Sequence, residues 1–431
     1  MFQLALIFIL VAVMGFWVIV PRGLEPALVA IVLLAMLWSY TPVLTGAGGS
    51  MTIFVTKFAG WGLLSVRVFR PLLLKAKVLR LDFLHAAWLA FTGYVLFTAA
   101  YSEIPYYTLQ RAISLALLVM GTYWALWGYI SDWKKAGEVV AIVAGIGLLA
   151  IATSAILLLA GYSGAFDAGR FAGSLGNANT VGSVVGLTAG PLWYLGTVHK
   201  SRLLRITMLF SLGLGVALTL LSESRAGLAG LVVAAAVILL GPGRPHQKVW
   251  AGLLTVAIIF AVLELPLGPY LPSLAERFEV SNVMEARLPL WQTAVDVAAR
   301  SPALGYGFGT APVLVPMGPH NTLLTLLLEV GLIGLALFAV VVMAGLSQVA
   351  KALSASAVRE HKPLAVACLS VTLAGLTNGL FESWWTSAGS LEGGLFWVTF
   401  MVGARLARLP VKGAASVPAV ATASGGGVGG R

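Results

Sequence analysis

The chain has 431 residues, of which 59% are hydrophobic and only 10% are charged. A soluble domain carries about 25% charged residues, so the composition excludes an ordinary soluble protein and indicates an integral membrane protein. The single cysteine, Cys368, excludes an internal disulfide and a cysteine metal cluster. Because lipid offers the backbone no hydrogen-bond partner, the membrane spans must be helical, and we predict an all-α, polytopic fold.

Apolar runs recur along the chain, and each is close to the ~20 residues that a helix needs to cross a bilayer. They predict about twelve spans, at residues 3–20, 24–44, 83–100, 108–130, 137–160, 178–198, 203–221, 226–241, 249–265, 321–344, 363–381 and 390–405. The segment 52–66 is short and contains Lys57, so we interpret it as interfacial or re-entrant. If it spans, the count becomes thirteen and the N-terminus lies outside. Residues 2–20 lack a basic n-region and a cleavage site, which favours a first span over a signal peptide.

The basic residues predict the orientation. All ten lysines and ten of the seventeen arginines lie on alternate loops, which by the positive-inside rule face the cytoplasm. The net charge of +11 is thus a topology signal and does not favour nucleic-acid binding. The remaining cationic residues are all arginines on or near the opposite face: Arg22, Arg111, Arg170, Arg225, Arg277, Arg287 and Arg300. Arginine suits bidentate contact with phosphate, although each of these arginines could instead pair with an acidic residue on the same face.

We expect a single transmembrane domain over residues 1–412, with a periplasmic loop at 266–320 inserted in it. The tail at 413–431 is rich in glycine, alanine and serine and is predicted to be disordered in the cytoplasm.

Two outer loops carry candidate substrate-binding residues. Arg170 precedes Asn177 and Asn179, which enter a span where free N–H groups could bind an anion; both amides could also be simple helix caps. Ser224 and Arg225 join two spans with almost no loop, so Arg225 is held at the membrane boundary, either as a phosphate ligand or as a snorkelling side chain.

The polar stretch before residue 320 carries the other candidates. Arg287 and Trp291 lie on a predicted helix from Met284 to Arg300, whose apolar stripe includes Leu288, Val295 and Ala298. The Trp291 side chain fits an interfacial anchor better than a platform for a sugar ring. His320 and Asn321 begin the next span; imidazole exchanges protons near neutral pH, although a capping asparagine beside a solvated histidine would explain the pair equally simply.

One further carboxylate lies within that span. Glu329 follows His320 by about two and a half helical turns, and a charge at that depth is costly unless it is paired. We therefore expect Glu329 to contact an arginine or another polar group, in a structural role.

Together these motifs resemble a known family. Arg287, Trp291, Pro302-x-Leu-Gly-x-Gly-x-Gly, His320-Asn321 and Glu329-x-Gly331 look like the signature of the O-antigen ligase and polymerase superfamily, and the Arg170–Thr180 and Ser224-Arg225 stretches match its earlier outer loops. The resemblance covers about residues 83–405. It implies a glycosyltransferase of the bacterial inner membrane that uses polyprenyl-diphosphate-linked glycans at the periplasmic face, without a nucleotide sugar, cofactor or metal.

By that resemblance, Arg170, Arg225 and Arg287 would hold the diphosphate and His320 would act at the acceptor hydroxyl or the leaving group. We expect metal-independent, inverting transfer, with lipid A core as the acceptor in lipopolysaccharide biosynthesis; repeat-unit polymerisation is the alternative, and a transporter of lipid-linked glycan is the competing class. Membrane lipids are expected partners, and nucleic acid is not. The predicted catalytic residues are His320 and Arg225, and the predicted substrate-binding residues are Arg170, Arg287, Arg111, Asn177, Asn179, Ser224, Asn321 and Trp291.

Overall fold

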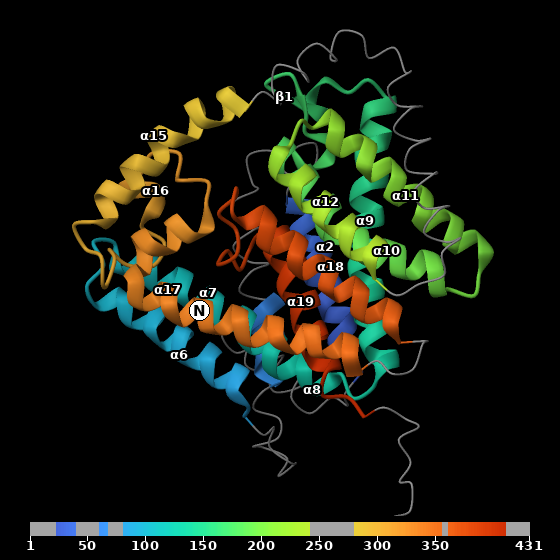
Figure 1. Cartoon of the computed structure of the whole chain (residues 1–431), viewed down its shortest axis with the longest axis horizontal. Helices are drawn as coiled ribbons and strands as arrows, with labels where there is room; N and C mark the ends of the chain where they lie inside the picture. The colour runs from blue at the N-terminus through green and yellow to red at the C-terminus, as the bar shows by residue number, and fades with distance from the viewer. Residues whose placement is uncertain (1–22, 40–59, 68–80, 242–279, 356–360, 411–431) are drawn as a thin grey trace, which may run out of the picture.

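The computed structural model describes residues 23–39, 60–67, 81–241, 280–355 and 361–410, and these are mostly helical (Figure 1). Each predicted span that falls within these residues contains helix: α2 (Glu25–Ser39), α6 (Phe83–Phe97), α7 (Pro105–Met120) with η4 (Gly121–Leu126) and α8 (Trp127–Tyr129), α9 (Trp133–Leu159), α10 (Ala178–Val198), α11 (Arg202–Leu221), α12 (Arg225–Leu240), α17 (Thr322–Ala355), α18 (Lys362–Gly379) and α19 (Leu391–Leu406). The predicted spans 3–20 and 249–265 lie outside the described residues.

Six of the described helices are long and apolar enough to cross a membrane, and α2 and α12 are shorter apolar helices. The helical membrane class is therefore confirmed, whereas the count of twelve stays a prediction. Within the predicted loop 266–320, the described part contains α15 (Val280–Ala298) and α16 (Ala311–Leu314). The described residues form one small sheet, the antiparallel hairpin of β1 (Phe166–Asp167) and β2 (Arg170–Phe171).

Side-chain caps define where many of the helices begin, because an oxygen at the N-cap accepts from a backbone N–H that the helix leaves free. Such caps are Asp82 for α6, Asp132 for α9, Asn177 for α10, Ser201 for α11, Ser224 for α12 and Ser390 for α19. Two of the predicted substrate-binding residues, Asn177 and Ser224, are thus already used by the fold.

Helix α10 is the centre of one group of helices, since it packs against α9, α11, α12 and α18. Its closest approach is to α12, where a Cβ on Gly227 would overlap the backbone of Gly182. Small residues at such a crossing allow two membrane helices to touch through their backbones. This crossing lies directly beneath Asn179 and Ser224, so it sets the spacing of the two loops that carry them.

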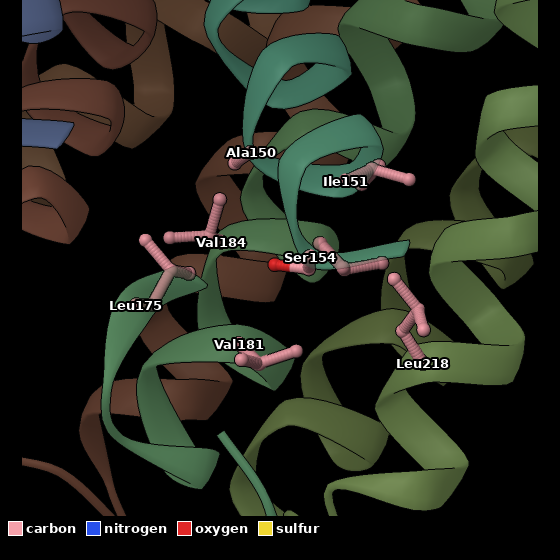
Figure 2. A pocket seen from close by; sticks show the side chains of 8 residues that line it. Ala150, Ile151, Ser154, Leu175, Val181, Val184 and Leu218 are labelled. Atoms are coloured by element: carbon pink, nitrogen blue, oxygen red, sulfur yellow. The ribbon is translucent and has the colours of Figure 1, made fainter. Parts of the chain in front are cut away.

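A small pocket lies between α9, α10 and α11 (Figure 2). Its lining is aliphatic except for one hydroxyl and consists of Ala150, Ile151, Ser154, Leu175, Val181, Val184, Val185 and Leu218. Such a lining offers no charge to a phosphate and no set of donors to a sugar, so the pocket does not fit the polar part of a glycan substrate.

Helix α17 belongs to a second group with α6, α15 and α19, and it is broken at Gly331, where φ is 62° and ψ is −169°. The chain between α15 and α16 docks into this break through four backbone hydrogen bonds: Tyr306 N to Leu328 O, Gly307 N to Glu329 O, Leu332 N to Pro302 O and Ile333 N to Ala303 O. A Cβ on Gly305 would lie 2.6 Å from the Gly331 nitrogen. The glycine-rich motif therefore serves close backbone packing.

The described part of segment 52–66 lies inside the bundle. Residues 60–66 are helical, and Trp61 is fully buried and donates from Nε1 to the Ala388 carbonyl at 2.9 Å. Arg67 Nε lies 3.4 Å from the Glu25 carboxylate at the start of α2. With twelve spans, Glu25 would face outward and Arg67 the cytoplasm. This contact does not fit the twelve-span prediction, which places the two residues on opposite faces of the membrane; residues 52–59 of the segment lie outside the described residues.

Candidate functional site

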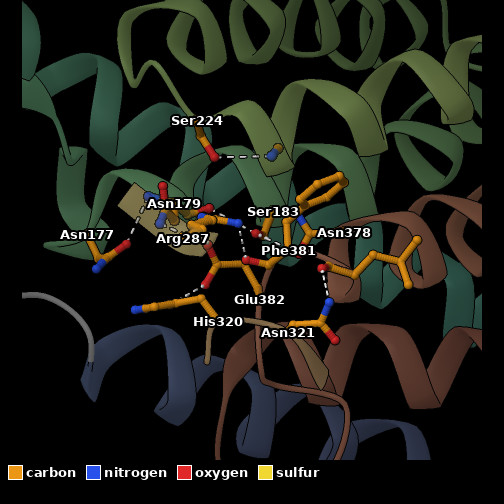
Figure 3. A network of polar contacts seen from close by, with 12 residues as sticks. Asn177, Asn179, Ser183, Ser224, Arg287, His320, Asn321, Asn378, Phe381 and Glu382 are labelled. Atoms are coloured by element: carbon orange, nitrogen blue, oxygen red, sulfur yellow. Dashed lines mark hydrogen bonds and ion pairs between the residues drawn. The ribbon is translucent and has the colours of Figure 1, made fainter. Parts of the chain in front are cut away.

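Glu382, in the connection between α18 and α19, joins three separate parts of the chain (Figure 3). Its Oε1 accepts a hydrogen bond of 2.9 Å from Asn179 Nδ2 on α10 and lies 3.6 Å from Arg287 Nη2 on α15. Its Oε2 lies 3.6 Å from His320 Nδ1, just before α17. We call Glu382, Asn179, Arg170, Arg287, His320 and Asn321 the Glu382 cluster.

Arg170 enters this cluster from the β1–β2 hairpin. The two residues at the hairpin tip, Ala168 and Gly169, have φ of 48° and 81°, as two-residue hairpin loops of the favoured twist require. The guanidinium donates from Nη2 to Asn179 Oδ1 at 2.8 Å, and from Nε and Nη2 to the carbonyls of Ser222 and Glu223 at 3.1 and 3.3 Å. Arg170 thus ties the hairpin, the end of α11 and the start of α10 together.

The other predicted residues of these two loops have local roles. Asn177 Oδ1 accepts from the N–H groups of Asn179 and Thr180, and Ser224 Oγ accepts from Gly227 N–H. For Asn177 the alternative interpretation as a helix cap therefore describes what the side chain does. Ser224 is also a cap, which was not predicted from the sequence. Arg225 is half-buried as the first residue of α12. In the sequence it follows Ser222 and Glu223, whose carbonyls Arg170 binds.

His320 and Asn321 are held by unusual backbone. His320 has φ of 45°, following Met317 at 69° and Gly318 at 71°, and non-glycine residues in this region carry strain that concentrates at functional sites. Asn321 caps α17 by accepting from Leu324 N–H at 3.1 Å, while its Nδ2 donates to the Leu380 carbonyl at 2.9 Å. The His320 side chain remains 39% exposed, so its ring is accessible.

Arg287 and Trp291 on α15 hold this loop from the other side. Arg287 Nη1 donates to the Phe381 carbonyl at 2.9 Å, and Trp291 Nε1 donates to the carbonyl of Pro319, the residue before His320, at 2.9 Å. Trp291 is therefore an anchor for the His320 loop. The predicted apolar stripe is only partly the packed face: Leu290, Ala294, Val297 and Ala298 pack inward, whereas Leu288 and Val295 are exposed.

Arg111 belongs to a different place. Its guanidinium lies 5.6 Å from the ring centroid of Phe308 and interacts electrostatically with Glu329. Glu329 is 1% exposed and accepts from Ala311 N–H at 3.4 Å. The expectation that Glu329 contacts an arginine or another polar group is thus confirmed through the Ala311 N–H. Arg111 has no described contact with the Glu382 cluster.

The cluster brings together one imidazole, one carboxylate and two guanidinium groups, and the imidazole side chain is partly exposed. Chemically this can bind an anion, orient an imidazole and accept a proton from a hydroxyl. In the part of the chain that the structure describes, no three histidine, cysteine, aspartate or glutamate side chains gather closely enough to hold a metal ion.

The sequence pattern alone does not identify Glu382. It is a single acidic residue just after a predicted span, where a solvated carboxylate is unremarkable. Two weak signals mark it: it has no basic residue nearby in sequence, and it lies in the aromatic run Phe381-Glu382-Ser383-Trp384-Trp385. Its partners come from residues 179, 287 and 320, and only the tertiary structure brings them together.

Comparisons with known proteins agree with the motifs. The O-antigen ligase family model matches residues 209–339, which include Ser224, Arg225, Arg287, His320 and Asn321. Proteins of Rickettsia typhi and Rickettsia conorii, both provisionally named polysaccharide ligases, are 23% and 26% identical over 194 and 157 residues. These alignments cover 39% and 32% of this chain and 46% and 37% of the relatives, so the chain spans less than half the length of each. By residues 209–339 the chain is related to the O-antigen ligases, and its resemblance to their superfamily is confirmed.

Proposed function

We propose that the chain is a membrane glycosyltransferase that moves a glycan from a polyprenyl-diphosphate carrier to an acceptor hydroxyl at the periplasmic face. The observation that carries this proposal is the Glu382 cluster, in which a reachable histidine lies beside a carboxylate and an arginine contributed by separate chain segments. The match to the O-antigen ligase model and the names of the relatives support a ligase of polysaccharides.

In this reaction His320 is the general base. Its Nδ1 faces Glu382, which leaves Nε2 for the acceptor hydroxyl. The hydroxyl proton passes to Nε2 while its oxygen bonds to the anomeric carbon, and the bond from that carbon to the diphosphate breaks with its electron pair on the leaving oxygen. Glu382 stabilises the imidazolium that forms, as the carboxylate of a catalytic triad does.

The arginines stabilise the leaving group. Negative charge grows on the departing diphosphate in the transition state, and fixed guanidinium groups placed there lower the barrier without reorganisation. Arg287 and Arg225 are the first candidates for this contact. Arg170 donates three hydrogen bonds to protein atoms, so we assign it to positioning the hairpin, and Asn179 serves as a donor that it orients. A single displacement of this kind inverts the anomeric configuration.

The most specific part of the proposal is the identity of the acceptor that receives the glycan. We favour ligation onto lipid A core, because the relatives carry the name of polysaccharide ligases; repeat-unit polymerisation uses the same chemistry on a different hydroxyl. A transporter of lipid-linked glycan could use a histidine–carboxylate pair as a proton relay, so the match to the O-antigen ligase model, and not the pair itself, favours the enzyme.

The test uses the purified full chain in lipid nanodiscs with a polyprenyl-diphosphate-linked glycan, lipid A core and a metal chelator. We expect a glycosylated acceptor together with released polyprenyl diphosphate in equal amounts. Translocation of the intact donor in liposomes, with no release of the diphosphate, would instead assign the chain to the transporter class. Replacing the core acceptor with a second repeat unit separates ligase from polymerase.

A further inference from the structure

The Glu382 carboxylate is shared between a guanidinium and an imidazole without bonding tightly to either. Arg287 Nη2 and His320 Nδ1 both lie 3.6 Å from its oxygens, whereas charge-assisted hydrogen bonds are about 2.7–2.9 Å long. The short contact, at 2.9 Å, comes from the neutral amide of Asn179. A small movement of the carboxylate toward the guanidinium therefore takes it away from the imidazole, and the reverse.

The groups that surround Glu382 are those that would bind a phosphate. A guanidinium, an imidazole and an amide N–H all donate hydrogen bonds to anionic oxygens. A carboxylate presents the same kind of oxygens as a phosphate, but it belongs to the chain itself. A bound diphosphate and a fixed carboxylate at the same position would repel each other, because both are negatively charged. The cluster cannot hold both in the present arrangement.

The backbone around Glu382 is held by two hydrogen bonds, so a change of partner must come from rotation of its side chain. Thr322 Oγ1 donates to the Glu382 carbonyl at 2.6 Å, and Arg287 Nη1 donates to the carbonyl of Phe381 at 2.9 Å. The side chains of His320 and Arg287 are 39% and 22% exposed, whereas that of Glu382 is 13% exposed, so a ligand reaches the cluster from the side of the imidazole and the guanidinium.

We propose that Glu382 occupies the position of a donor phosphate in the free protein, and that diphosphate binding at Arg287 and Asn179 transfers its carboxylate to His320. This inference rests on the proposed function and deepens it. With the diphosphate in place, the carboxylate closes on Nδ1 and orients the imidazole with Nε2 toward the acceptor. His320 is thus prepared as a base only after the donor has bound, and the donor binds before the acceptor reacts.

The experiment measures binding of inorganic pyrophosphate and of a short-chain polyprenyl diphosphate to the full chain in nanodiscs, by calorimetry, together with turnover. The variant is Glu382→Gln, which keeps the shape of the side chain and removes its charge. Asp296→Asn on α15 is the matched control, because Asp296 is exposed and the substitution changes the net charge by the same amount.

We expect Glu382→Gln to bind both diphosphates at least about tenfold more tightly, while its turnover falls because the imidazole loses its carboxylate. The control should bind and turn over as the wild type does. Tighter binding with slower turnover is a combination that loss of structure does not produce. Unchanged or weaker diphosphate binding by Glu382→Gln, including no binding by either protein, overturns the inference.

A second variant, Glu382→Asp, tests the inference if Glu382→Gln does not fold. Glu382→Asp keeps the charge but shortens the side chain, so it should bind diphosphates as weakly as the wild type and still lose turnover; wild-type turnover in this variant contradicts the transfer to His320. The two proposals fail separately. If the wild type performs the transfer and Glu382→Gln does not bind more tightly, only the inference fails. If Glu382→Gln binds more tightly but no glycan is ever transferred, the proposed function fails.

Discussion

Two arginine–glutamate sites lie along α17, one at its beginning and one at its break, and they differ in almost every respect except composition. At the beginning, Arg287 and His320 share the Glu382 carboxylate at 3.6 Å, and the histidine is 39% exposed. At the break, Glu329 is 1% exposed and accepts a backbone N–H, with Arg111 nearby over Phe308. The first site has reachable, loosely held charges. At the second site the Glu329 carboxyl is buried and accepts a backbone hydrogen bond. A buried acidic residue by itself therefore does not identify a reaction centre.

The largest expected effect on the first site comes from His320→Ala. Loss of a general base typically reduces turnover by about 10²–10⁴-fold, while a residue this exposed contributes little to stability. We expect protein abundance in the membrane and the melting temperature to stay near the wild-type values, as in the control His199→Ala at an exposed position. Turnover and abundance that decline in parallel would mean that His320 is only part of the cap.

The second site should respond to packing instead of charge. Gly331→Ala places a Cβ against the Ala303 carbonyl at a φ of 62°, and we expect a loss of at least ~2 kcal/mol in unfolding free energy, measured by thermal denaturation in detergent. Gly161→Ala has nearly the same φ of 63° but open space around it. This control isolates the backbone strain, of about 1 kcal/mol. Equal losses in the two variants would contradict the importance of the docked loop.

Arg287→Lys tests whether the first site needs the planar guanidinium group with its several donors, or only a positive charge. Arg287 uses one nitrogen for the Phe381 carbonyl and presents another to Glu382, and an ammonium group cannot reproduce both. We expect roughly tenfold lower transfer activity with little change in melting temperature. The same substitution at Arg225 should fail in the same way if that guanidinium also holds the diphosphate. Full activity in the lysine variants would mean that only the positive charge matters at both positions.

The smallest effect is expected for Glu329→Gln. The amide keeps an oxygen that can accept from Ala311 N–H, so the turn stays closed and transfer activity should remain within about twofold of wild type, with a stability loss below ~1 kcal/mol. Activity assays and thermal denaturation on the same preparation measure both. A loss of activity comparable with that of His320→Ala would erase the distinction between the two sites.

Much of the fold follows from local patterns. Apolar runs predict α6 to α12 and α17 to α19, because a helix that crosses a bilayer needs about 20 apolar residues. Asn177 is recognisable as a potential cap from its position before one of these runs, whereas the cap at Ser224 was not predicted. The position of the described part of segment 52–66, inside the bundle, was not predictable in this way. Lys57 weighs against a span by composition, whereas the pairing of Arg67 with Glu25 and the burial of Trp61 depend on neighbours distant in sequence.

The candidate site was predicted in part. The structure brings five of the predicted residues into one cluster: His320, Asn321, Arg170, Asn179 and Arg287. These residues lie at the ends of neighbouring helices, where polar side chains come close to one another. Arg111 lies elsewhere because its helix turns it toward Phe308. Glu382 was missed, because its importance comes from three partners in other segments and not from any local motif. The roles of all these residues in a reaction stay predictions.

The contact of α10 with α12 through Gly182 and Gly227 has a consequence for how such a site can diversify. Where two helices meet through bare backbone, any larger side chain at the contact would overlap the facing helix, so substitution there is strongly restricted. The distance between Asn179 and the loop that carries Arg225 is therefore a constant of the scaffold. Variation in the sugars accepted must come from parts built differently, such as the tip of the β1–β2 hairpin and the exposed side of α15, and these are the places where a redesign should begin.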